Sequence, residues 1–202
     1  MNLPTEQQCL ELFEKYKVPS NIKEHCLNVR KVAVFLAKKL TEQGLNINVE
    51  LVDRAALLHD LFKVVALKNI KPNKHHQRTF SAEEKAMWQK LRATYPNMHE
   101  SQVAYLFFND EYPDLASTIR RSGDHSVKDR TWEERLIYYI DHRILKNQLV
   151  TLSERLIYAR EVYPMGDSFW DQVEKEDRLL ETDIFSYLLF LPEQLAEQLQ
   201  NV

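Results

Sequence analysis

The stretch RAALLHDLFKV, residues 54–64, is an apolar helical run whose polar end carries a histidine and an aspartate side by side. Its apolar residues continue a pattern that begins at Leu51, at the three- and four-residue spacing of one buried helix face. A carboxylate at the end of such a run is costly to bury unless a cation or hydrogen-bond donors pair with it. His59 and Asp60 are therefore either a hydrogen-bonded structural pair or two ligands of a metal ion. In the second case, the other ligands must come from elsewhere in the chain.

Most of the chain around this stretch also predicts helices. The sequence has only three glycines in 202 residues, which favours helices over sheets and glycine-rich loops. Ser20 is expected to cap a helix through about Lys39 that stops near Gly44, and Asn48 is expected to cap the next one. Capping-box spacing occurs at four further positions, Thr5, Ser81, Thr131 and Thr151. The later helices are expected at about 81–94, 98–109, 112–122 and 131–148, over LSERLIYAREVYP before Pro164, and after Pro192. No segment alternates convincingly as a strand, so the expected fold class is all-α, a compact multi-helix bundle.

Composition excludes several classes of protein. Hydrophobic residues make up 44% of the chain, enough for a real core, and the formal charge of −3 predicts no nucleic-acid surface. The chain has no glycine-rich phosphate loop, which argues against P-loop and Rossmann nucleotide sites. Cys9 and Cys26 form no disulfide framework or zinc knuckle, and they fit a reducing compartment. With no signal-peptide core and no long apolar run, we expect a cytoplasmic protein with no membrane or nucleic-acid partner.

The domain organisation is expected to be simple. Residues 64–80, VVALKNIKPNKHHQRTF, are basic, contain Pro72 and predict a loop. We expect a main domain over residues 1–165 and a helical extension over residues 166–202 that packs on the same domain. The aromatic and aliphatic side chains of the extension indicate core packing first and a dimer contact second. The sequence leaves the oligomeric state open.

Further histidines and acids lie on or beside the predicted apolar helices. A single histidine beside a core stripe is usually a hydrogen-bonded structural residue, and His99 or His125 alone would be read as a surface residue or a cap. Asp141 lies within RLIYYIDHRIL and must be either solvated or paired. Four histidines and two aspartates together supply ligand types for one or two divalent metals: His25, His59, Asp60, His99, His125 and Asp141.

The order of these residues resembles the HD superfamily of metal-dependent phosphohydrolases. EHCLNVRKVAVFLAKKL resembles the helix of its first ligand, AALLHDLFK its signature helix, and ERLIYYIDHRI the helix of its last aspartate. His99 in MHESQVAYLF and His125 in SGDHS resemble the extra histidines of its binuclear members. The resemblance covers about residues 18 to 160 and implies a compact all-α HD-domain fold.

The resemblance also implies a ligand set. One metal would bind His25, His59, Asp60 and Asp141, and a second would bind His99 and His125 with Asp60 bridging the two. Histidine and carboxylate ligands suit iron, manganese, nickel, cobalt or zinc. Phe62 departs from the family, because many relatives carry glycine before the signature lysine. We expect Phe62 to pack in the core without loss of metal. The chain also lacks the Gly-Tyr-Pro signature of the cyclic-dinucleotide phosphodiesterase branch.

The implied chemistry is attack of metal-bound hydroxide on phosphorus. Asp60 and Lys63 are the expected catalytic residues, and Lys63, Arg120 and Arg121 the expected contacts of a phosphorylated substrate. Lys63 fits a solvated cation at a helix end equally well. The basic residues of the 64–80 loop fit either a lid that attracts phosphate or an ordinary solvated loop: Lys68, Lys71, Lys74, His75, His76 and Arg78. His142 is expected to face away from the site.

The sequence leaves three functions open. The first is an enzyme, a hydrolase that cleaves a phosphoester or phosphoanhydride bond of a nucleotide or other small phosphorylated molecule. Diadenosine tetraphosphate is a reasonable substrate, because binuclear relatives hydrolyse it. The second is a di-iron oxygenase, since some members of the superfamily use the same ligand set with dioxygen. The third is a non-catalytic sensor that binds a nucleotide without turning it over.

Overall fold

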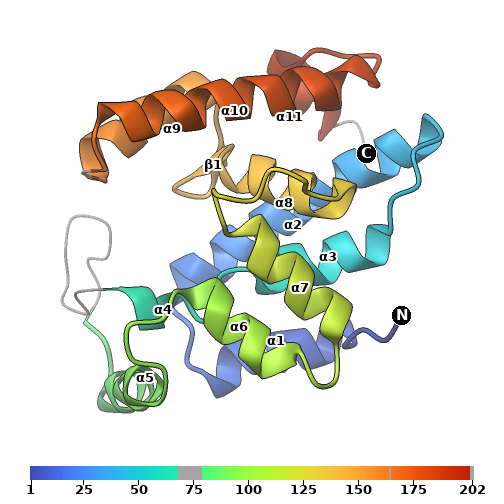
Figure 1. The fold of residues 1–202 in the computed structure, drawn as a ribbon. Coiled ribbons are helices and arrows are strands. Elements are labelled where there is room, and N and C mark those ends of the chain that lie inside the picture. The colour runs from blue at the N-terminus through green and yellow to red at the C-terminus, as the bar shows by residue number, and fades with distance from the viewer. Residues whose placement is uncertain (68–78, 164, 201–202) are drawn as a thin grey trace.

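The computed structural model describes residues 1–67, 79–163 and 165–200, and its fold is all-α, as the sequence predicts (Figure 1). A two-stranded hairpin is the only sheet among these residues. The elements in chain order are α1 (Glu6–Lys15), α2 (Ser20–Glu42), α3 (Val49–Leu58), α4 (Lys63–Ala66), α5 (Ala82–Thr94), α6 (Glu100–Phe108), α7 (Pro113–Ser122), α8 (Trp132–Asp141), β1 (Ile144–Leu145), β2 (Gln148–Leu149), α9 (Leu152–Val162), α10 (Asp167–Ser186), a 3-10 turn (Pro192–Gln194) and α11 (Leu195–Gln198).

Side-chain caps fix where several helices begin. The four predicted capping boxes are confirmed, at Thr5, Ser81, Thr131 and Thr151. In each of them the hydroxyl accepts a hydrogen bond from a backbone N–H three residues on, and the acidic or amide side chain there reaches back. Asn48 caps α3 as predicted, accepting from the Leu51 N–H at 3.0 Å. Ser20 is instead the first residue of α2, and Pro19 precedes it without a side-chain hydrogen bond.

Two boundaries differ from the sequence prediction. The helix expected over 131–148 ends at Asp141 and is followed by the hairpin, in which Ile144 pairs with Leu149. Lys146 and Asn147 form its turn with φ of +47° and +65°, a left-handed conformation that stops a right-handed helix. The predicted loop over 64–80 begins as the single helical turn α4, which starts at Lys63. Residues 68–78 of the predicted loop lie outside the described residues.

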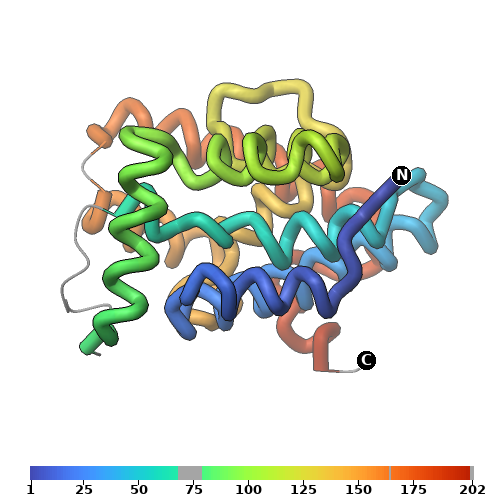
Figure 2. Tube along the Cα trace, turned by 90° about the horizontal axis from the view of Figure 1, so that it is seen from below, coloured from blue at the N-terminus to red at the C-terminus, as the bar shows by residue number. Residues whose placement is uncertain are grey.

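Helix α3 is the centre of the fold. Its side chains from Ala55 to Leu58 are fully buried. It packs against α2, α7 and α8, and Figure 2 shows it lying between α2 on one side and the α6–α7 pair on the other. A helix that is apolar over most of its surface must be covered on several sides. This position explains why the polar end of α3 meets side chains from several other helices.

Helices α9 and α10 form a layer along one edge of the molecule (Figure 1), and α10 packs on α9 and α8. The buried Arg143 guanidinium joins this layer to the end of α8, because it donates to Glu181 of α10 at 2.8 Å and to the Tyr139 hydroxyl. The division at residue 165 stays a prediction. Across the described ranges, every helix is too short or too polar to cross a bilayer.

Candidate metal centre

Three central helices bring together four of the predicted metal ligands. His25 lies on α2, one position before the fully buried Cys26, so its side chain stands at the edge of the core. His59 and Asp60 follow directly after α3, and Asp141 is the last residue of α8. Because α2, α3 and α8 pack against one another, these positions converge although they span 117 residues of sequence between them. The local sequence places each ligand on its helix, and helix packing makes them neighbours.

The ligand atoms are spaced as donors to one cation would be. One atom each of His25, His59 and Asp60 lies within 4.8 Å of the others, and no other group of three such residues meets this condition in the described part of the chain. Asp141 Oδ1 lies 2.8 Å from His25 Nε2 and 3.6 Å from His59 Nε2. Neighbouring ligands bound at about 2.1 Å to one ion lie roughly 3 to 3.5 Å apart. His25, His59 and Asp60 therefore meet the spacing of ligands to one divalent metal, and Asp141, which is not part of that group of three, is hydrogen-bonded to His25 beside it.

The tautomer of His59 supports this fit. Its Nδ1 lies 2.8 Å from the Ala56 carbonyl oxygen, which can only accept, so Nδ1 carries the proton. In the neutral ring the lone pair is then on Nε2. Nε2 is buried and has no hydrogen-bond partner among the described residues. Anchoring one ring nitrogen and leaving the other free is the usual arrangement of a metal-binding histidine. A metal ion would satisfy this otherwise unpaired atom.

The charges of the centre are strongly coupled. Burial raises the pKa of Asp141, but the hydrogen bond from His25 and the charge of the nearby His59 ring outweigh it and hold that pKa well below its usual range. Burial likewise opposes the charged form of His59, yet the Asp60 carboxylate raises the pKa of His59 well above its usual value. The protein without metal therefore retains a proton among these ligands. Metal binding must displace that proton.

Lys63 lies beside the centre and has two carboxylate partners. Its Nζ is 3.3 Å from Asp60 Oδ1 and 2.5 Å from Glu100 Oε1. Burial lowers the pKa of Lys63, and the two carboxylates raise it well above its usual value, so the ammonium stays charged. Glu100 was not predicted as a site residue. An acidic residue is common at the first position of a helix, because it complements the helix dipole. Nothing in the sequence indicates that Glu100 is buried.

The two remaining predicted ligands lie apart from this cluster. His99 is the N-cap of α6, where its Nδ1 lies 3.3 Å from the Ser101 backbone N–H, and half of its side chain is exposed. His125 lies in the loop before α8, with Nδ1 3.1 Å from the Tyr138 hydroxyl and its ring 5.5 Å from that of Phe169. Neither joins the group formed by His25, His59 and Asp60.

The extension contributes a partner that sequence reasoning missed. The sequence predicts that His142 faces away from the site, and His142 is not among the converging ligands. Its Nδ1 lies 2.9 Å from Asp177 Oδ2 of α10. Its ring also lies 5.5 Å from that of His125, tilted by only 24°. Asp177 is only 1% exposed, and nothing in the polar sequence around it signals burial. The pairing depends entirely on how α10 packs on α8.

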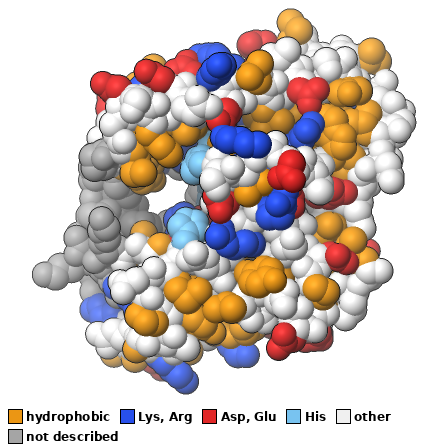
Figure 3. All heavy atoms as spheres, in the orientation of Figure 1, with side chains coloured by type: hydrophobic (Ala, Val, Ile, Leu, Met, Phe, Trp, Pro, Cys, Tyr) orange, Lys and Arg blue, Asp and Glu red, His pale blue; other side chains and the backbone are white. Residues whose placement is uncertain are grey.

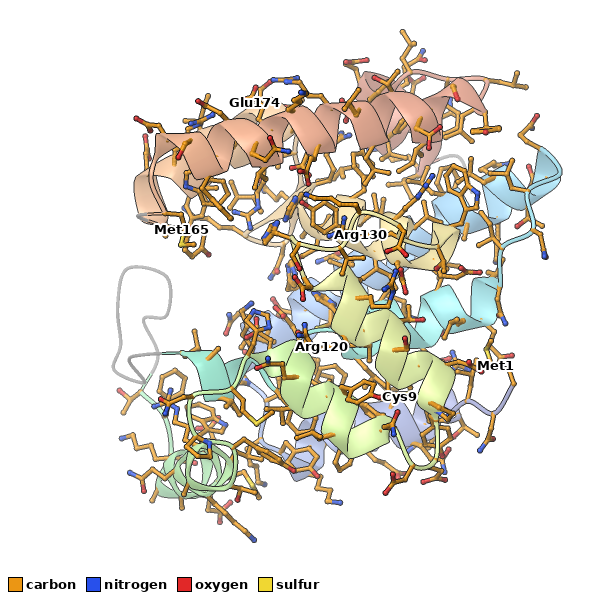
Figure 4. The ribbon with its side chains drawn as sticks, in the orientation of Figure 1. Met1, Cys9, Arg120, Arg130, Met165 and Glu174 are labelled. Atoms are coloured by element: carbon orange, nitrogen blue, oxygen red, sulfur yellow. The ribbon has the colours of Figure 1, made fainter. Side chains whose placement is uncertain are left out.

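The predicted substrate arginines take part in ion pairs of the protein. Arg120 of α7 (Figure 4) lies 3.0 Å from Asp124, and Arg121 lies 2.8 Å from the buried Glu134. Arg130, which was not predicted, lies below α10 in the same view, and its guanidinium sits 3.9 Å from the Tyr138 ring. The basic residues of the 64–80 loop from Lys68 to Arg78 lie outside the described residues. Figure 3 shows a hollow with histidine side chains at its edge, between the α9–α10 layer and α4 to α6.

Comparison with known proteins gives one match. The family model for the HD domain matches residues 22–144, a range that contains all four converging ligands. No curated protein and no solved structure matches the chain.

Proposed function

This chain belongs to the HD domain family, part of a superfamily of metal-dependent phosphohydrolases, and from this premise we propose its own reaction. It hydrolyses a phosphoester or phosphoanhydride bond of a nucleotide or other small phosphorylated molecule, with a divalent transition metal as cofactor. The observation that supports the proposal is the grouping of His25, His59 and Asp60, with Asp141 beside the two histidines and the buried His59 Nε2 otherwise unpaired. A buried nitrogen without a partner costs free energy unless a ligand satisfies it.

The residues of the metal centre have different roles in the proposed reaction. His25, His59, Asp60 and Asp141 would hold the metal, which when bound lowers the pKa of a coordinated water and polarises a phosphoryl oxygen. Lys63 keeps 37% of its side chain exposed and can therefore donate to a phosphate oxygen while it stays anchored to Glu100. The Ala56 carbonyl keeps the His59 ring in the tautomer that ligation requires.

Purified protein, stripped of metal and reloaded with Mn²⁺, Fe²⁺, Co²⁺, Ni²⁺ or Zn²⁺, tests the proposal on a panel of phosphomonoesters, phosphodiesters, nucleotides and dinucleoside polyphosphates. We expect metal-dependent release of phosphate or nucleotide that is lost in Asp60→Asn. Asp171→Asn is the matched control, because Asp171 is an exposed aspartate of α10. A metal-loaded wild type that is inactive on the whole panel would contradict the proposal.

A further inference from the structure

The Asp60 carboxylate faces two different neighbours with its two oxygen atoms. Oδ2 lies 3.9 Å from His59 Nε2, on the side of the converging metal ligands. Oδ1 lies 3.3 Å from Lys63 Nζ. In a centre with two metals, a bridging carboxylate would give one oxygen to each ion. Here the second oxygen already faces a cation, the lysine ammonium.

The surroundings of Lys63 are those expected around a second cation. Glu100 Oε1 accepts from Nζ at 2.5 Å, and the Glu100 side chain is only 5% exposed. Its other oxygen is buried without a hydrogen-bond partner in the part of the chain that the structure describes. His99 Nε2 lies 3.5 Å from the same Oε1. Two carboxylates and an imidazole thus gather where Asp60 turns away from the first metal, and Lys63 lies between the carboxylates.

A second metal fits poorly at this position. It would compete with Lys63 for Asp60 Oδ1 and Glu100 Oε1, and it would meet the repulsion of the ammonium. His125, the other ligand implied for that metal, is turned toward Tyr138, His142 and Phe169. The residues present therefore fit the first metal and do not fit the second.

We propose that the centre binds one divalent metal and that the Lys63 ammonium takes the place of a second one. Glu100 is then a positioning residue that holds Lys63 beside Asp60. The part of the proposal that concerns substrate rests on the proposed function: a phosphoryl group would bind between the metal and the ammonium. The part that concerns metal number does not depend on any activity. One metal per chain also argues against di-iron chemistry, which requires two.

Metal-free wild type titrated with Mn²⁺ tests the metal number, with binding followed by calorimetry, elemental analysis and electron paramagnetic resonance. We expect one ion per chain and no exchange-coupled signal. Two ions per wild-type chain, or a coupled signal, would overturn the proposal even if the protein proves inactive on every phosphoester.

Variants of Lys63 test whether its ammonium is what prevents a second metal from binding. Lys63→Met keeps the stem and removes the charge, and we expect it to gain a second, weaker Mn²⁺ site. The double variant Lys63→Met with Glu100→Gln should return to one ion, and Lys63→Arg should never exceed one. A folded Lys63→Met protein that still binds one ion would overturn the role given to the ammonium. Inorganic phosphate should bind the Mn²⁺-loaded Lys63→Met protein roughly tenfold or more weakly than wild type. Unchanged phosphate affinity would overturn the substrate part alone.

Discussion

Replacing Phe62 by alanine tests what this residue does where many relatives carry glycine. Phe62 is 1% exposed, and its ring makes edge contacts with Tyr16 at 5.1 Å and with Phe107 at 5.3 Å. Its φ of −101° is open to any residue, so the backbone does not require glycine here. The structure therefore gives Phe62 a packing role, and the substitution should lower stability while leaving the metal ligands in place.

The expected loss in the free energy of unfolding follows from the buried ring and the aromatic contacts that Phe62→Ala removes. Burial of a phenylalanine side chain contributes about 1.5 to 3 kcal/mol, and each aromatic pair adds about 0.5 to 1.5 kcal/mol. With the cavity that remains, Phe62→Ala should lower the free energy of unfolding by about 3 to 5 kcal/mol. A domain of ordinary stability, about 5 to 15 kcal/mol, survives such a loss at room temperature.

Urea unfolding of the metal-free protein measures this loss, and titration with Mn²⁺ measures the metal number of the same variant. Phe62→Leu should lose less than Phe62→Ala, because it refills most of the space. Leu189→Ala is the control, since Leu189 is 92% exposed and should change stability by less than about 0.5 kcal/mol. A loss below about 1 kcal/mol in Phe62→Ala, or a stable variant that no longer binds metal, would refute the packing role.

Three further predictions concern the metal, the pH dependence of stability and the α9–α10 layer. Mn²⁺ at about a thousand times its Kd should stabilise the wild type by about 4 kcal/mol and raise Tm by roughly 10 °C in calorimetry; an equal rise in His59→Ala would contradict the ligand assignment. Burial lowers the pKa of His125 to about 4, so the unfolded chain binds a proton more readily than the folded one between about pH 6.5 and 4. The free energy of unfolding should therefore be highest above about pH 6.5 and fall by at most about 3 kcal/mol as the pH drops to 4. A His125→Gln variant with the same pH dependence in urea unfolding would exclude His125 as the cause. Arg143→Met should cost about 3 kcal/mol by leaving Glu181 without its cation, and hydrogen exchange should increase in α10 first; unchanged exchange there would show that this ion pair does not hold the layer.

Much of the local structure can be predicted from short stretches of the sequence. The four capping boxes and the Asn48 cap could be predicted because each needs only residues three positions apart. The all-α class followed from apolar spacing and the scarcity of glycine. The helix over 131–148 was predicted too long, because continuing apolar residues do not reveal that Lys146 and Asn147 turn the chain into a hairpin.

The candidate site, too, could be predicted only in part from the sequence. The sequence alone determined that His25, His59, Asp60 and Asp141 lie on or directly after apolar helices, because helix periodicity fixes the face on which a residue lies. Only the tertiary structure decided which side chains meet. It paired Lys63 with Glu100 and His142 with Asp177, and it turned His125 toward Tyr138. These pairings depend on the packing of helices distant in sequence, and a hydrogen bond forms only when that packing brings donor and acceptor to about 3 Å.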